Sequence, residues 1–227
     1  MKLAWASLIA ATLVLGAQGV TARAQSAAAQ AKTETFEVDY TNPGLAPSHW
    51  TIVLHPDGSG RFSSYGGSMG ADGSDLKAPP VNRDIQVSKE FAARVFQTAY
   101  KHNLFNTECE SHLKVAFQGT KVFRYTGPKG SGTCTFNYSK NKEIESLGNS
   151  LMAVEQTVME GARLELLLKH DPLGLDREMR YLVQAAKDGR AQQLCVIKGI
   201  LTQLAGDPEV LDRVRQWADE LLAKSNS

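Results

Sequence analysis

The spacing of the apolar residues changes once along this chain, close to residue 140. Before that point, apolar and polar residues alternate in short runs, as at 36–40, which read Phe-Glu-Val-Asp-Tyr. Such alternation is typical of strands with one buried face. Afterwards, apolar residues recur every three or four positions, as at Leu151, Val154 and Val158, and this period is typical of amphipathic helices. Together the two periods predict an α+β fold: antiparallel β-hairpins with one inserted helix, then a helical C-terminal half packed on the sheet.

The aromatic residues mark the same boundary. Between residues 25 and 227, all of them except Tyr181 and Trp217 precede residue 140. Aromatic side chains suit the pleated surface of a sheet, whereas Leu and Ala, which dominate the later part, favour helices. We therefore expect a β-rich half at residues 33–140 and a helical half at 141–227, joined in one compact unit.

Turn residues divide the β-rich half into short elements. The predicted strands are residues 36–40, 50–54, 61–65, 83–87, 113–117 and 123–125. Pro and Gly at 56–60 turn the chain between the second and third strands, and Gly119-Thr120 forms the turn of a later hairpin. Residues 66–82, rich in Gly and Pro, are expected to form a surface loop or an open edge of the sheet. Ser88 is expected to begin the inserted helix as its N-cap.

Four helices are expected in the C-terminal half. The first runs to about His170, the second starts at Asp176, and the third ends at Gly206. The last is expected to begin at Asp207-Pro208, because Asp is a favoured N-cap and Pro suits the first helical position.

Residues 1–24 have the features of a secretory signal peptide. A positively charged residue precedes an apolar stretch at 3–15, and Ala-Arg-Ala at 22–24 is a small-residue cleavage motif. The apolar stretch is too short for a membrane anchor. We expect an exported protein, periplasmic or secreted, that begins at Gln25 with a mobile leader at 25–32. No stable membrane insertion is expected after removal of the signal.

Cysteine spacing predicts one disulfide bond. Cys109 lies just before the first arm of the expected 113–125 hairpin and Cys134 lies beyond the second, and antiparallel arms bring these two ends together. An oxidising destination favours this bond, which closes a loop that stabilises the fold by about 3.5 kcal/mol in the chain-entropy model. Cys195, beside Leu194 and Val196, is expected to be a free, buried thiol that acts as a small hydrophobe.

Four sequence features carry a family resemblance. They are KVAFQGT at 114–120, YTG at 125–127, Cys134, and HDPLGLD at 170–176. Over roughly residues 35–180 the chain resembles a group of uncharacterised exported bacterial proteins, in which a Cys-bracketed β-hairpin precedes a helical half. The resemblance implies export and this fold, and it implies no activity.

Ser68 stands in the sequence Gly-Gly-Ser-Met-Gly at 66–70, which matches the G-x-S-x-G nucleophile elbow. That motif needs a strand before the serine and a helix after it. Residues 71–80 contain too many Gly, Asp and Pro for a helix. A Gly-rich surface loop is therefore the simpler interpretation.

Three further patterns lack the context that their chemistry requires. Residues 127–133 resemble a phosphate-binding loop but lack the Lys that must follow its last Gly, so a turn at the end of a hairpin is expected. Asp72 and Asp75 lack the other ligands of a calcium loop. The five histidines form no zinc motif. Only His55 and His112 are expected on strands where their side chains could converge. The others are His49, His102 and His170. No catalytic, cofactor-binding or metal-binding residue is predicted.

Charge limits the kinds of partner. The 25 basic and 24 acidic residues nearly balance, so the chain lacks the excess of basic residues that nucleic-acid binding requires. These observations favour an exported, non-catalytic binding or interaction domain, with an unknown protein or envelope ligand as its partner. The alternative is a small extracytoplasmic hydrolase that uses Ser68.

A location for the binding surface follows from the aromatic residues. We expect aromatic side chains on both faces of the hairpins, with Tyr65 pointing opposite to Phe62, whereas the helices cover only one face. Exposed aromatic residues are common anchors of interfaces. A binding surface is then expected on the β-rich half beside the 66–82 loop. The alternative is that the leader or the loop covers these side chains.

Overall fold

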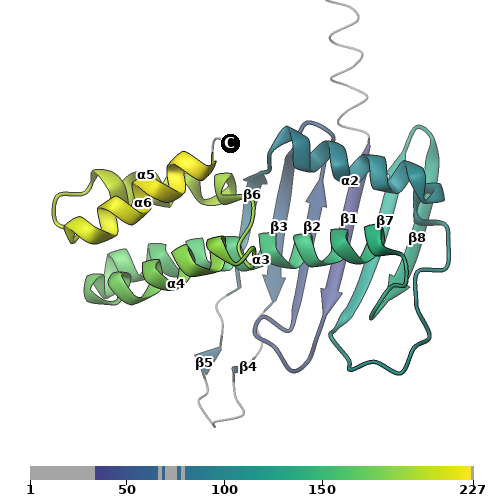
Figure 1. The fold of residues 1–227 in the computed structure, drawn as a ribbon, viewed down its shortest axis with the longest axis horizontal. Coiled ribbons are helices and arrows are strands. Elements are labelled where there is room, and N and C mark those ends of the chain that lie inside the picture. The colour runs from purple at the N-terminus through teal and green to yellow at the C-terminus, as the bar shows by residue number, and fades with distance from the viewer. Residues whose placement is uncertain (1–33, 66–67, 70–75, 78–79, 226–227) are drawn as a thin grey trace, which may run out of the picture.

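A computed structural model describes residues 34–65, 68–69, 76–77 and 80–225, the two short pairs by their backbone alone. Six strands form one antiparallel sheet in the order β6-β3-β2-β1-β7-β8 (Figure 1). They are β1 (Thr35–Thr41), β2 (His49–Leu54), β3 (Ser59–Tyr65), β6 (Asn82–Gln86), β7 (Thr120–Gly127) and β8 (Gly130–Phe136). A separate two-stranded ribbon consists of β4 (Ser68–Met69) and β5 (Leu76–Lys77).

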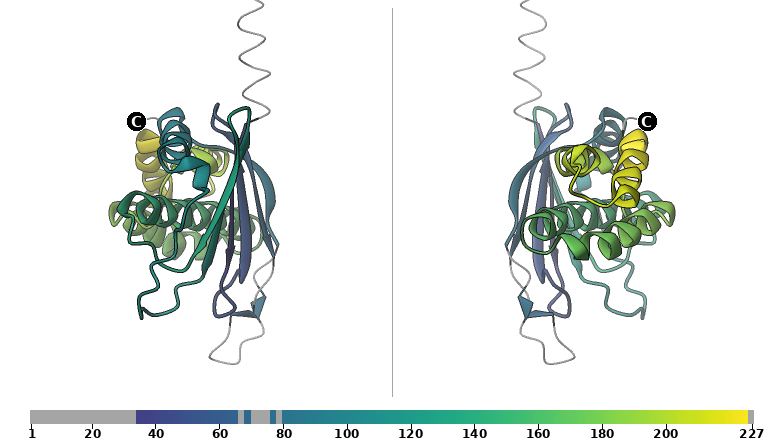
Figure 2. Two further views of the ribbon diagram at one scale, coloured as in Figure 1. Left: turned by 90° about the vertical axis from the view of Figure 1, so that its right-hand side faces the viewer. Right: turned by 90° about the vertical axis from the view of Figure 1, so that its left-hand side faces the viewer.

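The helices lie on one face of this sheet and beyond one of its edges (Figures 1 and 2). They are α2 (Lys89–Lys101), η1 (Asn103–Phe105), α3 (Lys142–His170), η2 (Pro172–Gly174), α4 (Leu175–Lys187), η3 (Leu194–Ile197), α5 (Lys198–Gly206) and α6 (Asp212–Ser225). Helix α2 and the first part of α3 cover the sheet, and α3 then continues past β6, where α4, α5 and α6 pack around it (Figure 1). The predicted α+β class is confirmed, with a helix between the strands and a helical C-terminal half.

The sheet buries one face because its side chains alternate in register. Val38 of β1 lies between Ile52 of β2 and Phe123 of β7. The apolar inner face consists of Phe36, Val38, Tyr40, Trp50, Ile52, Leu54, Phe62, Ile85, Phe123, Tyr125 and Phe136, all of them buried. The alternate positions, such as Glu37 and Arg124, face away from the helices. Strand aromatics on both faces were therefore a wrong expectation except at Tyr65, whose side chain is exposed.

Two hydrophobic clusters share α3. The first joins the inner face of the sheet to α2 and the first part of α3, and it extends to Val158 and Ala162. The second joins Leu164 of α3 to the apolar residues of α4, α5 and α6. Val196 of η3 packs against both clusters. The long helix is therefore the main structural link between the sheet and the C-terminal helices.

The second hairpin differs from the predicted one. Strand β7 pairs with β8, in a register that closes at Gly127 and Gly130, so the turn lies at Pro128-Lys129 and not at Gly119-Thr120. The motif at 127–133 therefore contains this turn and the first residues of β8, and it does not follow a completed hairpin as predicted. Residues 112–118 belong to no strand. The error arose because 112–118 alternate like a strand, whereas β8 reads Gly-Ser-Gly-Thr-Cys-Thr-Phe and carries little apolar signal.

The last helix begins later than predicted. Helix α6 starts at Asp212, and Asp207 instead forms a turn in which its carboxylate accepts a hydrogen bond from the Glu209 N–H at 2.9 Å. The backbone N–H of Val210 bonds to the Asp207 carbonyl at 3.2 Å. This turn places Val210 in the second cluster before the helix begins.

Candidate binding surface

The segment between the disulfide and β7 displays apolar side chains to solvent. Every residue from 112 to 118 is exposed, and Leu113, Val115 and Phe117 are 51%, 40% and 59% exposed. We call residues 112–118 the apolar arm. Its loop hangs on the helix-covered side of the sheet, at the end where β7 begins and β8 ends (Figures 1 and 2). The arm therefore has the apolar alternation of a strand but pairs with no strand of the sheet.

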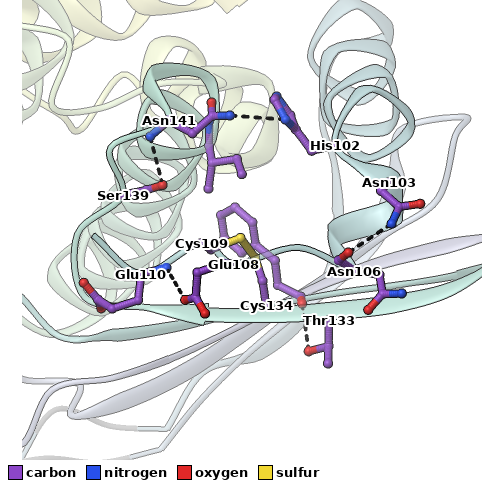
Figure 3. Close-up of a disulfide and its surroundings, with 12 residues drawn as sticks. His102, Asn103, Asn106, Glu108, Cys109, Glu110, Thr133, Cys134, Ser139 and Asn141 are labelled. Atoms are coloured by element: carbon purple, nitrogen blue, oxygen red, sulfur yellow. Dashed lines mark hydrogen bonds between the residues drawn. A yellow bond between two sulfur atoms is a disulfide. The ribbon is translucent and has the colours of Figure 1, made fainter. Parts of the chain in front are cut away.

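The disulfide fixes the chain just before the arm (Figure 3). Cys109 and Cys134 are bonded with a Cα–Cα distance of 5.7 Å, and both are buried. The predicted pairing is confirmed, although its geometry differs: Cys134 lies within β8 opposite Phe123, and Cys109 lies in the loop after η1. Cys195 is the free cysteine, and it is half-buried rather than fully buried.

Glu110 holds the first residues of the arm through its carboxylate. One oxygen accepts hydrogen bonds from the backbone N–H groups of Ser111 at 2.7 Å and His112 at 3.3 Å. The other accepts from the Asn137 N–H at 2.7 Å. These bonds, that from Asn137 first, lower the pKa of Glu110 because they stabilise its charged form. The Ser111 N–H also reaches the Tyr138 carbonyl at 2.9 Å, so the loop is tied to the chain that follows β8.

Asn137 and Tyr40 hold the other end of the arm. The Asn137 side chain donates to the Ala116 carbonyl at 3.1 Å and accepts from the Gln118 N–H at 2.7 Å. The Tyr40 hydroxyl donates to the Gln118 carbonyl at 2.6 Å. Gly119 follows with φ +103°, and a Cβ at this position would overlap the Tyr40 ring. Only glycine suits both the left-handed backbone and this close approach.

The two anchors leave the apolar side chains little freedom to turn inward. A segment that is ordered before binding loses less conformational entropy when it docks. The arm also carries few charged side chains: Lys114 is its one Lys or Arg, and His112 lies 3.6 Å from the Glu108 carboxylate. The arm is therefore an ordered, mainly apolar segment that is exposed to solvent.

Two other exposed apolar side chains lie at the same end of the sheet. Tyr65 ends β3, is 57% exposed and stacks on His49, with 5.0 Å between the ring centroids. Leu45, in the loop between β1 and β2, is 46% exposed. The expected surface beside the 66–82 loop therefore includes Tyr65, whereas the side chains of 66–79 lie outside the described residues. Sequence reasoning missed the arm, whose signal was an apolar alternation with no strand partner.

The other motifs form no site among the residues that the structure describes. Ser68 lies in β4, which pairs with β5, and its side chain is outside the described residues. Asp72 and Asp75 are also outside them. His55 contacts the Glu34 carbonyl at 3.2 Å, far along the fold from His112 and its partner Glu108. Across the described ranges, no group of three or more His, Cys, Asp or Glu residues is arranged to hold a metal ion.

No helix in the described part of the chain is both long and apolar enough to span a membrane. The sequence matches no protein-family model, and no curated protein shows significant similarity to it.

Proposed function

We propose that this protein is an exported, non-catalytic binding protein that docks onto a partner protein through the apolar arm. The observation that carries the proposal is the exposure of Leu113, Val115 and Phe117 on a segment that is anchored at both ends. Exposed apolar side chains that lie next to one another on a fixed backbone are typical of interfaces. The signal-like residues 1–24 and the disulfide support export to an oxidising compartment, periplasmic or extracellular.

The chemistry of the arm favours a protein partner over a charged surface. Lys114 is the one Lys or Arg within the arm, and Glu108 lies against His112. A membrane rich in anionic lipid or a nucleic acid would need a denser set of cations. Full burial of a Phe, Leu or Val side chain contributes about 1.5–3 kcal/mol each. Phe117, as the largest and most exposed of the three, is the expected anchor residue.

Site-specific cross-linking tests this proposal. Replacement of Phe117 by the photoreactive p-benzoylphenylalanine should yield, in intact cells, one dominant cross-linked protein that mass spectrometry identifies. With the purified partner, Phe117→Ser should weaken binding by about tenfold or more, which corresponds to 1.4 kcal/mol. The wild-type fold should persist, because the Phe117 side chain is exposed and contributes little to the core.

The matched control is Leu173, which is 83% exposed at the turn between α3 and α4. A photoreactive residue there should not give the same cross-linked protein, and Leu173→Ser should leave the affinity unchanged. Equal cross-linking from both positions, or unchanged affinity of the Phe117→Ser variant, would show that the arm is not the docking surface.

A further inference from the structure

A groove runs between α2 and the first turns of α3. It encloses about 500 Å³, which is within the range of small-molecule sites. Its walls contain Arg94, Gln97, Lys101, Lys142, Glu143 and Ser146. Leu147 and Thr98, both buried, form the floor of the groove. The Thr98 hydroxyl already donates to the Arg94 carbonyl at 2.8 Å. Charged and polar groups therefore form its walls.

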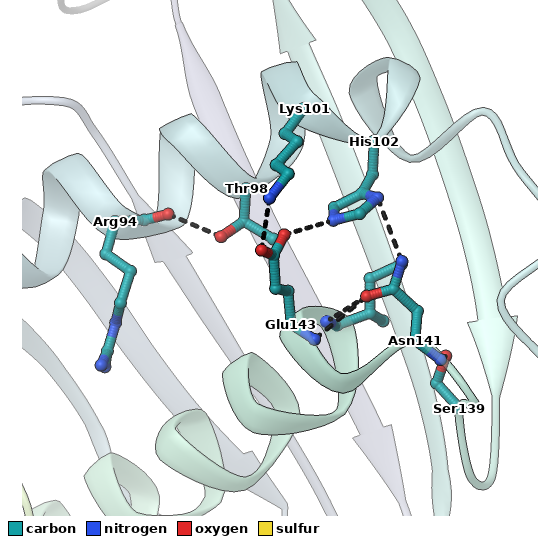
Figure 4. A network of polar contacts seen from close by, with 8 residues as sticks. Arg94, Thr98, Lys101, His102, Ser139, Asn141 and Glu143 are labelled. Atoms are coloured by element: carbon teal, nitrogen blue, oxygen red, sulfur yellow. Dashed lines mark hydrogen bonds and ion pairs between the residues drawn. The ribbon is translucent and has the colours of Figure 1, made fainter.

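The one carboxylate of the lining is already neutralised (Figure 4). Glu143 forms an ion pair with Lys101 and accepts a hydrogen bond from the His102 ring at 2.8 Å. The ion pair with Lys101, followed by the contact with His102, lowers the pKa of Glu143 and keeps it charged. An anion in the groove would therefore not face an unpaired carboxylate.

The orientation of His102 follows from the N-cap of α3. The Asn141 side-chain oxygen accepts from the backbone N–H groups of Glu143 at 3.0 Å and Ile144 at 3.3 Å. The Asn141 amide nitrogen must then be the atom that faces His102 Nδ1, at 3.2 Å. Nδ1 accepts this bond, so Nε2 carries the hydrogen and donates to Glu143. This chain of bonds keeps Glu143 turned toward Lys101 and His102 (Figure 4).

Two cations of the lining form no ion pair with any residue in the described ranges. Arg94 lies over the Phe91 ring, 5.0 Å from its centroid, and donates to the Ser150 hydroxyl at 3.3 Å. Lys142, in the first turn of α3, has no carboxylate within ion-pair distance in the same ranges. Ser146 and Gln97 add a hydroxyl and an amide to the walls. Arginine, lysine and neutral donors in one groove form a typical oxyanion-binding set.

We propose that this groove binds a small molecule through a carboxylate or phosphate group held by Arg94 and Lys142. Ser146 and Gln97 supply hydrogen bonds, and Leu147 contacts the apolar part of the ligand. The proposal is independent of the arm, because the two surfaces share no residue.

Titrations followed by two-dimensional NMR test this proposal. Acetate, succinate and inorganic phosphate serve as separate probes, with total ionic strength kept constant by NaCl. Saturable shifts of the amide signals of residues 94–101 and 142–147 are expected with at least one probe, and the responsive probe shows which oxyanion fits. Arg94→Gln and Lys142→Met should each weaken that binding by about tenfold.

Lys89→Met is the matched control, because Lys89 is exposed on α2 and does not line the groove. Its titration should equal that of the wild type, and all variants should retain the wild-type amide spectrum elsewhere. Shifts that fail to saturate with all three probes would overturn the proposal. Equal weakening in the Lys89→Met variant would overturn it as well, because it would assign the effect to general charge.

Discussion

Two carboxyl groups meet in the helical layer, at Glu160 of α3 and Glu178 of α4. Glu178 is 5% exposed and pairs with Arg163 at 3.0 Å. Burial, followed by the hydrogen bond and the negative charge of Glu178, raises the pKa of Glu160 well above its usual range. The positive charge of Arg163 acts on both carboxyl groups and cannot neutralise two negative charges. One of the two carboxyl groups therefore keeps its proton in the folded protein near neutral pH.

Glu160→Gln tests this protonation. An unfolded glutamate loses its proton near pH 4.3, whereas folded Glu160 keeps its proton to higher pH. The folded state then binds more protons, so the stability of the wild type falls as the pH rises from about 4.3 through the raised pKa. Gln removes this loss, and thermal unfolding should show the variant gaining stability over the wild type between pH 5 and 8. Glu220→Gln, at an exposed site on α6, should follow the wild type, and parallel curves for Glu160→Gln would contradict the assignment.

At the scale of single elements, local sequence explains most of the fold. The alternation at 36–40 correctly predicts β1, and the apolar period after residue 140 correctly predicts helices. Ser88 caps α2 as predicted, because its hydroxyl accepts a hydrogen bond from the Phe91 N–H at 3.1 Å. The alternation in the arm is the same as that of a real strand, so the sequence predicts a strand there. Its position outside the sheet depends on Tyr40 and Asn137, which are distant in sequence, and no local pattern contains that information.

The turn at η1 was equally hidden from the sequence. Asn103, Leu104 and Phe105 all have positive φ, at 52°, 57° and 65°, a conformation that local preferences disfavour for such residues. Phe105 is fully buried between Phe36 and Phe123, with ring centroids 5.6 and 5.3 Å away. A Cβ at Gly132 of β8 would collide with the Leu104 carbonyl. Tertiary packing, together with one glycine of another element, selects this backbone.

The arm as an element depends on Gly119, and Gly119→Ala should disturb it. The positive φ and the contact with Tyr40 should make the variant less stable by about 1–3 kcal/mol in urea unfolding. Gly199→Ala, in the first turn of α5, is the control, because a Cβ added there would meet no atom within 4 Å beyond its chain neighbours and the backbone of its own helix; its stability should equal or slightly exceed that of the wild type. Equal stability of the Gly119→Ala variant and the wild type would show that this anchor is not needed.

At the scale of the whole molecule, α3 is the structure that the two hydrophobic clusters share. Its 29 residues span about 43 Å at 1.5 Å per residue. The first part of α3 packs against the inner face of the sheet, and its last part packs against α4, α5 and α6 (Figure 1). We therefore expect the helical end to open without complete loss of the sheet.

Leu201→Ala, at a fully buried position of α5, tests this division. The cavity should lower stability by about 2–5 kcal/mol. Hydrogen exchange measured by mass spectrometry should show the larger loss of protection in α4, α5 and α6 and a smaller one in β1, β2 and β7. Ile52→Ala, in the sheet cluster, should reduce protection in both regions, because the C-terminal helices depend on α3. Uniform acceleration in the Leu201→Ala variant would show that the chain unfolds as one unit.

The arm and its supports also have an evolutionary consequence. Glu110, Asn137, Tyr40 and Gly119 fix the path of the backbone, whereas Leu113, Val115 and Phe117 contribute little to the core. Under the docking role that we propose, mutations that change partner choice and mutations that damage folding would therefore fall on different residues. Such a surface can diversify between lineages at little risk to stability, as the binding loops of rigid scaffolds do. The same separation makes 113–117 a natural position for grafting foreign recognition sequences.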